Sequence, residues 1–359
     1  MKKHIIILLY LSLFLSACSE NKEAKKENEL TNTKTHHFEY AQFLEISQTY
    51  DEVQITIKDL NGEIAHDYFL AAKKLPLNEL SVMSTTHVGM IAALEKIEAI
   101  TSFSDMKLIH NKALYKRFEN GKTIETAGFG LANLEVFLRT KPDAIIYSGF
   151  DESNPILAKL HAAKLTTIAN YEWKETHPLG RAEWIKFFGV LLDKEAKADS
   201  VFQQIETNYH AIKDSIAKYA TNRPTVLVGT PYGDQFNVPA GNSYMAKILA
   251  DLQVDYIYSE TDGVASHTYS LEKVISENKH TDYWLNVAAT NRNEILELNS
   301  KFKLLDAVNT GKTYSYFKNV NKFWEESAIR PDLLLLDLAA IFHPELFELE
   351  QFHYYSVVK

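Results

Sequence analysis

Apolar and polar positions repeat with two different periods along this chain, and the changes of period mark its predicted elements. Residues 53–58 alternate strictly between apolar and polar, and Asn61-Gly62 separates them from a second expected strand at 64–70. A period of two is typical of a half-buried strand, and an Asn-Gly pair between two strands predicts a type I′ turn. We therefore expect the folded part to open with a β-hairpin.

Beyond the hairpin, strand-like and helix-like segments alternate. This order predicts an α/β lobe with a largely parallel sheet. We expect strands at 80–84, 144–148 and 165–169 and helices at 86–96, 134–139 and 156–163.

The middle of the chain has a helical period instead, at 181–192 and again at 194–220, with no strand pattern between them. In the second stretch the apolar residues keep a spacing of three to four, which predicts an amphipathic helix of roughly 35–40 Å. A helix of that length can connect two lobes as a rigid linker. Alternation resumes after Pro224, with strands expected at 225–230, 256–259 and 283–287 and helices at 243–252 and from 271.

The N-terminus has the pattern of a lipoprotein signal. Lys2 and Lys3 precede an apolar run at 5–15 that is too short to span a bilayer, and the run closes at Cys18, the only cysteine of the 359 residues. We predict cleavage before Cys18 and lipid attachment to it, while a buried core cysteine stays an alternative. The charged stretch that follows has little to bury and predicts a flexible tether. The expected organisation is a signal peptide at 1–17, lipidated cysteine and tether at 18–37, an N-terminal lobe at 38–192, a linker helix at 193–220 and a C-terminal lobe at 221–359.

Charge and motifs exclude several functions. The net charge is −9 and the folded part has no basic run, so nucleic acid is not an expected partner. Gly128-Phe129-Gly130 lacks the third glycine of a dinucleotide fingerprint, and the chain has no P-loop, G-x-S-x-G or H-E-x-x-H motif. A metal site built from distant histidines stays open, because ligands converge only on folding.

Glu135 and Glu272 occupy equivalent places in the two predicted lobes. Each lies in the first turn of a short helix, after a capping residue and a leucine, and a strand follows each helix. A glutamate there complements the helix dipole by a few tenths of a kcal/mol. From the residues alone, that local role is the simpler interpretation.

Several stretches, in their order and spacing, resemble the class III substrate-binding proteins of ABC importers, which carry iron-siderophores, haem or cobalamin. The resemblance implies two Rossmann-like lobes with largely parallel sheets, joined by a long rigid α-helix. It also implies that Glu135 and Glu272 dock against arginines of a permease. The stretches that carry it are 84–87, 133–135, 141–146, 178–185, 240–246 and 324–332.

The resemblance also implies that ligand binds in a cleft between the lobes. His87 follows the first parallel strand and is expected to face the cleft, with an unliganded helix-start histidine as its alternative. Arg330 could bind an anionic ligand or form a structural salt bridge. The chain lacks a cluster of arginines, which disfavours a highly anionic catecholate and leaves cobalamin, haem or a less charged siderophore. The aromatic walls are expected from Trp173, Tyr232, Tyr316 and Trp324.

We therefore predict a binding protein without catalysis or resident cofactor, which captures an iron complex or cobalamin and delivers it to an ABC permease and its ATPase. It is expected to be a monomer in the cell envelope, lipid-anchored and facing the periplasm or extracytoplasmic side. The alternatives are capture of bare zinc or manganese, a lipid-anchored α/β hydrolase, or a surface scaffold.

Overall fold

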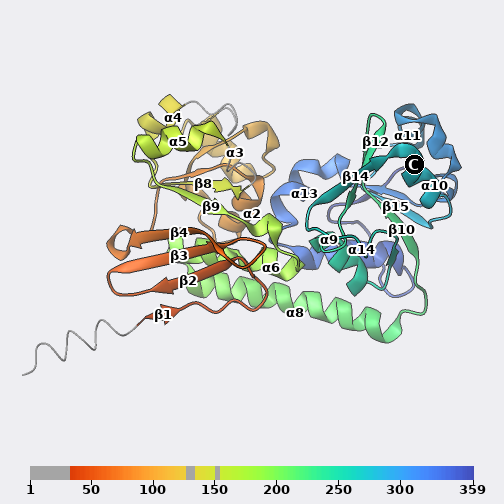
Figure 1. The fold of residues 1–359 in the computed structure, drawn as a ribbon, viewed down its shortest axis with the longest axis horizontal. Coiled ribbons are helices and arrows are strands. Elements are labelled where there is room, and N and C mark those ends of the chain that lie inside the picture. Colours follow the sequence, from red (N-terminus) through yellow and green to blue (C-terminus); the bar gives the residue numbers. More distant parts are fainter. Residues whose placement is uncertain (1–32, 127–133, 150–153) are drawn as a thin grey trace, which may run out of the picture.

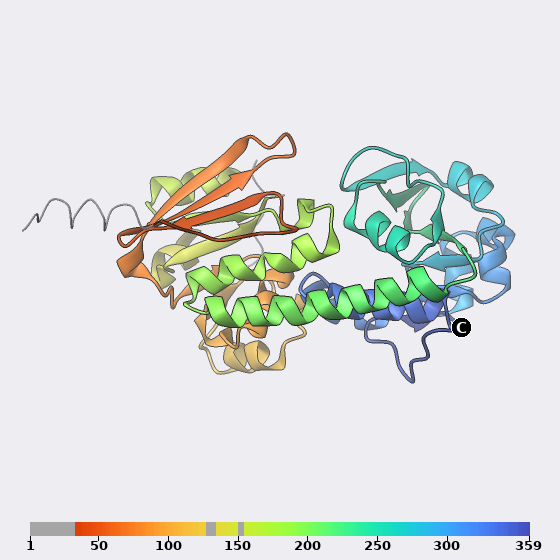
Figure 2. The same cartoon turned by 90° about the horizontal axis from the view of Figure 1, so that it is seen from below.

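The computed structural model describes residues 33–126, 134–149 and 154–359, so Cys18 and the predicted signal peptide lie outside the described residues. Two lobes lie side by side, and helix α8 (Glu195–Tyr219) runs along both of them (Figures 1 and 2). Within the described ranges, no helix is both long and apolar enough to cross a membrane. The predicted α/β architecture with a long connecting helix is confirmed.

An antiparallel sheet in the order β1-β2-β3-β4 opens the fold. The predicted hairpin is β3 with β4, but its turn is not type I′. The amide of Gly62 donates to the carbonyl of Asp59 (3.0 Å), and Gly62 has φ +81° while Asn61 does not have positive φ. The Asp59 carboxylate also accepts from the Asn61 and Glu63 amides, which fixes the longer turn. The bounds are β1 (Lys34–Thr35), β2 (Leu44–Gln48), β3 (Glu52–Lys58) and β4 (Ile64–Ala71).

The folded part begins earlier than the sequence pattern indicates. Lys34 and Thr35 pair with Gln48 and Ser47, so the last residues of the predicted 18–37 tether belong to a sheet. This correction has a simple cause, because backbone pairing with an edge strand needs no apolar side chains.

The N-terminal lobe is built on a parallel sheet in the order β7-β6-β5-β8-β9. Its predicted strands and helices are present, but the helix expected at 181–192 is two helices, α6 and α7, that meet at Trp184. The bounds are β5 (Leu80–Val82), α2 (Thr85–Ala93), β6 (Ile100–Phe103), α3 (Lys112–Glu119), β7 (Ile124–Glu125), α4 (Leu134–Thr140), β8 (Ala144–Ser148), α5 (Pro155–Ala162), β9 (Thr167–Asn170), α6 (Pro178–Glu183) and α7 (Ile185–Leu191).

The C-terminal lobe has a sheet in the order β13-β10-β15-β16-β17, parallel except for β17, and a second, antiparallel sheet in the order β11-β12-β14. The sequence pattern does not predict this second sheet. The bounds are β10 (Thr225–Val228), β11 (Thr230–Tyr232), β12 (Gln235–Pro239), α9 (Tyr244–Asp251), β13 (Asp255–Tyr256), β14 (Ser266–Ser270), α10 (Leu271–Glu277), β15 (Tyr283–Leu285), α11 (Arg292–Leu298), α12 (Asp306–Asn309), β16 (Thr313–Ser315), α13 (Val320–Glu326), α14 (Pro331–Phe342) and β17 (Ser356–Val357).

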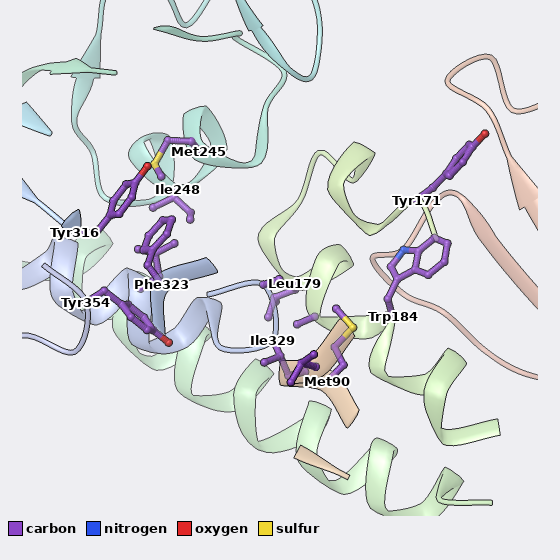
Figure 3. Close-up of a cluster of buried hydrophobic side chains, with 14 of the residues drawn as sticks. Met90, Tyr171, Leu179, Trp184, Met245, Ile248, Tyr316, Phe323, Ile329 and Tyr354 are labelled. Atoms are coloured by element: carbon purple, nitrogen blue, oxygen red, sulfur yellow. The ribbon is translucent and has the colours of Figure 1, made fainter. Parts of the chain in front are cut away.

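Two further helices connect the lobes. Helix α14 packs along α8, and α13 reaches across to pack against α2 of the N-terminal lobe (Figure 1). Figure 3 shows the buried side chains at this junction, where Ile329 lies near Met90 and Leu179. The lobes are therefore joined by packed apolar surface as well as by the linker helix.

Candidate ligand-binding site

A pocket of about 310 Å³ lies where the two lobes meet. Residues that directly follow β10, β15 and β16 line it, among them Gly229, Asn286 and Tyr316. The carboxyl ends of parallel strands are where α/β folds bind ligands. Two hollows of about 550 and 560 Å³ lie elsewhere, one reaching the amino end of β10 and the other over β1 to β3, and neither has this placement.

Aromatic side chains form one wall of the pocket. Trp173 comes from a short 3-10 helix (Glu172–Lys174) after β9, whereas Tyr316 and Trp324 come from the C-terminal lobe. The Tyr316 ring is stacked on Phe323 at 3.9 Å and meets Trp324 edge-on at 5.8 Å. In Figure 3, Tyr316 lies above Phe323 and beside Met245, so the wall is backed by packed core. The structure thus brings together three of the four aromatic residues expected there.

Arg181 of α6 is a charged side chain of the pocket lining. Its Nε lies 2.8 Å from Oε2 of Glu172, and the side chains of both residues are less than a tenth exposed. The guanidinium also stacks over the Tyr244 ring at 4.2 Å, across the junction of the lobes. Burial acts to lower the pKa of Arg181, but Glu172 and Tyr244 raise it overall, so the group stays charged and paired.

Polar side chains of the antiparallel sheet of β11, β12 and β14 also line the pocket. Thr230 and Asn237 face each other across β11 and β12, and both line the pocket. The other face of this sheet carries Phe236 and Val238, which are fully buried. The sheet therefore presents an apolar face to the core and hydroxyl and amide groups to the pocket.

Tyr232 does not line the pocket. It lies at the end of β11, is 81% exposed and pairs with Gln235 beside the hairpin turn. The prediction of an aromatic wall at this position is wrong in this structure, because the short β11 carries the side chain out to the tip of the hairpin.

His87 does not face the cleft either. It is 1% exposed in α2, its ring lies 5.6 Å from that of Phe188 in α7, and burial lowers its pKa to about 3. The third residue of α2 turns toward α7 and not toward the end of β5, so His87 is a neutral core residue.

Arg330 forms the structural salt bridge that was its alternative role. Its Nε and one terminal nitrogen lie 2.8 Å from the two carboxylate oxygens of Asp332, which is 2% exposed. Arg330 is not part of the pocket lining. A bidentate pair two residues apart leaves little of the guanidinium for a ligand.

Helix α13 joins the pocket to the contact between the lobes. Trp324 lines the pocket, and the carboxylate of Glu325 accepts hydrogen bonds from the backbone amides of His110 (2.8 Å) and Asn111 (3.0 Å). Glu325 is 2% exposed, and burial raises its pKa to about 7 despite these two bonds. The backbone of Gly89 in α2 packs directly on the carbonyl of Glu325. We call this set of contacts the α13 clasp.

Glu135 and Glu272 are both exposed and lie in the first turns of α4 and α10. In Figure 1 both helices lie on the side of the molecule away from α8. Glu272 pairs with Lys301 at 2.8 Å, which lowers the pKa of Glu272, while Ser270 caps α10. Asn133, the expected cap of α4, lies outside the described residues.

Sequence reasoning missed the residues that connect the pocket walls. Arg181 and Tyr244 lie in stretches that carried the family resemblance. Asn286 falls inside the strand expected at 283–287, and only the structure shows that β15 ends before it. Asn237 and Ser266 lie on strands that were not predicted, so no local pattern could have found them.

Two α/β lobes with a pocket between their strand ends define a two-lobed solute-binding protein. The family model described as periplasmic binding protein matches residues 80–319, more than half of the chain. The chain therefore belongs to the periplasmic binding protein family, a family of binding proteins.

Individual relatives agree with this assignment. A lipoprotein of Methanocaldococcus jannaschii is 28% identical over 293 residues, covering 78% of this chain and 69% of the relative. A periplasmic binding protein from Veillonella parvula has a similar fold, with a TM-score of 0.63, 16% identity and coverage of 87% and 98% of the two chains. A periplasmic heme binding protein from Pseudomonas aeruginosa also has a TM-score of 0.63, with 15% identity and coverage of 79% and 98%. Family and relatives indicate an extracytoplasmic location.

Proposed function

We propose that this chain captures an iron complex, either a siderophore or haem, or cobalamin in the pocket between its lobes and delivers it to an ABC permease. The observation that carries this proposal is a pocket at the carboxyl ends of β10, β15 and β16, walled from both lobes, in a chain of this family. A solute held there contacts both lobes at once.

The aromatic wall suits a large organic ligand. Trp173, Tyr316 and Trp324 offer wide, rigid surfaces that lose little side-chain entropy on binding. At about 310 Å³ the pocket is at the lower end of the usual range for organic ligands, and it is partly open to solvent. The ligand would therefore extend beyond the enclosed volume.

Two of the alternatives, capture of a bare metal ion and hydrolysis, have less support. The described residues hold no group of three or more His, Cys, Asp or Glu able to bind a metal ion. The described pocket lining includes Ser243 and Ser266 but no histidine or carboxylate to activate a serine. A bare metal ion and a hydrolase substrate each need such groups, so an organic chelate or macrocycle fits this lining better.

The partners follow from the same proposal. Lipid on Cys18 would hold the protein within tether reach of its permease, and relatives are themselves named lipoproteins. Glu135 and Glu272, exposed on one side of the two lobes, would dock on arginines of the permease, whose ATPase drives import. For Glu272 this requires exchange of the Lys301 pair for a permease arginine.

Equilibrium binding to the purified protein tests the proposal. Trp173 and Trp324 lie at the pocket, whereas Trp184 and Trp284 are fully buried elsewhere, so a ligand in the pocket quenches part of the tryptophan fluorescence. Haemin, cyanocobalamin and ferric siderophores should be titrated in turn. If none of them binds, the proposed function is wrong.

A further inference from the structure

We infer that the natural ligand is electrically neutral and carries amide or other carbonyl oxygens around an apolar body. This inference rests on the proposed function and specifies its substrate class. Three features of the pocket lead to it: its charge, its hydrogen-bond donors and its aromatic wall.

The part of the pocket lining that the structure describes offers no free positive charge to an anion. Arg181 is the only charged side chain of the described lining, and Glu172 neutralises it within a buried pair. The nearby Lys174 is not part of the lining, and its Nζ lies over the Tyr171 ring. The ranges 127–133 and 150–153, outside the described residues, contain neither Lys nor Arg, and the whole chain carries −9. An anionic group buried here would lose its hydration without gaining a counter-charge.

The pocket does offer neutral donors. The side-chain oxygen of Asn237 accepts from the Thr268 hydroxyl (2.7 Å), and that of Asn286 accepts from the Tyr355 hydroxyl (2.7 Å). These bonds orient both amides, and among the described residues neither Nδ2 group has a hydrogen-bond partner. Both residues line the pocket, so two NH₂ groups are available to acceptors on a ligand. Carbonyl oxygens are the neutral acceptors that match them.

Tyr316 fits the same pattern. Burial raises its pKa well above the ordinary value of a tyrosine, with Tyr244 adding to the effect. Its hydroxyl therefore stays protonated and acts as a donor, whereas an axial bond to ferric haem would need the phenolate. With Trp173 and Trp324 beside it, the wall combines apolar surface with a neutral donor.

Isothermal titration calorimetry on the full-length protein in detergent tests the inference with two pairs of probes. Cyanocobalamin and ferrichrome are neutral overall and rich in amide carbonyls, while haemin and ferric enterobactin carry carboxylate or catecholate charge. We expect a neutral probe to bind at least about tenfold more tightly than either anionic probe. Its Kd should change less than about twofold between 50 and 500 mM NaCl, since no net charge is screened.

A variant localises the effect. Asn237→Asp keeps the shape of the side chain and its acceptor for Thr268 but replaces the NH₂ donor with a negative oxygen. The Kd of this variant for the neutral probe should rise about tenfold, because the variant loses one hydrogen bond to the ligand and its carboxylate repels a ligand carbonyl oxygen. The control is Asn299→Asp, the same charge change at a helix cap outside the pocket, where either residue serves equally. It should leave the Kd unchanged.

The outcomes separate the inference from the proposed function. Tightest binding of haemin or ferric enterobactin, weakened by salt, would overturn the inference and leave the proposed function in place. An equal effect of both Asn→Asp variants would overturn the assignment of Asn237 as a ligand donor. No binding of any probe would overturn the proposed function and the inference together.

Discussion

Gly89→Ala is the sharpest perturbation of the α13 clasp. A Cβ atom at Gly89 would lie 2.0 Å from the carbonyl oxygen of Glu325, and an ordinary contact begins at 3.4 Å. The Cβ is fixed to the backbone of α2, and the atom it meets belongs to the backbone of α13, so no side chain can rotate away. The two helices must therefore separate by about 1.4 Å. Overpacking of this kind costs about 1–3 kcal/mol, and the better helix propensity of alanine returns about 1 kcal/mol.

The lobes can relieve the clash by moving apart, which moves Trp324 away from the pocket residues of the N-terminal lobe, Trp173 and Arg181. The net shift of up to about 2 kcal/mol against the closed arrangement of the lobes would weaken ligand binding by up to about 30-fold. The assay is the titration described above, together with urea denaturation of each variant. Gly189→Ala is the matched control, because its Cβ would meet Ala198 at 2.7 Å between α7 and α8, away from the pocket. It should lower stability while leaving the Kd unchanged.

Two results would refute this reasoning. If Gly89→Ala changes the free energy of unfolding by less than about 0.5 kcal/mol and leaves the Kd unchanged, α2 and α13 do not pack as described. If both glycine variants weaken binding equally, the loss reflects general destabilisation and not the clasp.

Three further predictions concern buried and terminal groups. The pKa of Glu325 is raised in the folded state, so the contribution of Glu325 to stability is full below about pH 4.5 and falls by up to about 3 kcal/mol as pH rises to 7. Glu325→Gln should remove this part of the pH dependence of the free energy of unfolding, measured by urea denaturation. An unchanged pH profile would contradict this prediction. Glu172→Gln leaves Arg181 buried without its counter-charge and should lower the free energy of unfolding by about 3–5 kcal/mol, whereas a loss below 1 kcal/mol would argue against a buried pair. Cys18→Ser should move the protein from the membrane fraction to the soluble fraction, and retention in membranes would speak against lipid attachment there.

The elements with a strong period were predictable from the sequence. Strand β8 matches its predicted range, and α8 begins and ends within one residue of the range predicted for the helix, 194–220. Buried strands and long amphipathic helices both leave clear apolar patterns in the sequence. The sheet of β11, β12 and β14 has no such apolar pattern in the sequence. β11 has three residues, and β14 carries mostly polar or half-buried side chains, so pairing with β12 and not local pattern determines it.

The candidate site residues also divide into those with a local signal in the sequence and those without one. Asp332 lies two residues from Arg330, so the salt bridge had a local signal that favoured the structural role. The orientation of His87 depends on Phe188 in α7, about a hundred positions along the chain, and no local pattern carries that information. Tertiary packing therefore decides which face of α2 is buried.

The position of Trp324 next to Glu325 has a kinetic consequence. Successive residues of a helix point about 100° apart, so Trp324 on one side of α13 borders the pocket, while Glu325 on the adjacent side accepts hydrogen bonds from amides 215 and 214 positions away in the sequence. A ligand that immobilises α13 also holds the lobes together, and lobes held together keep the ligand enclosed. Residence time is then set by the slowest opening of the clasp, and a permease that pulls the lobes apart would speed release without touching the ligand.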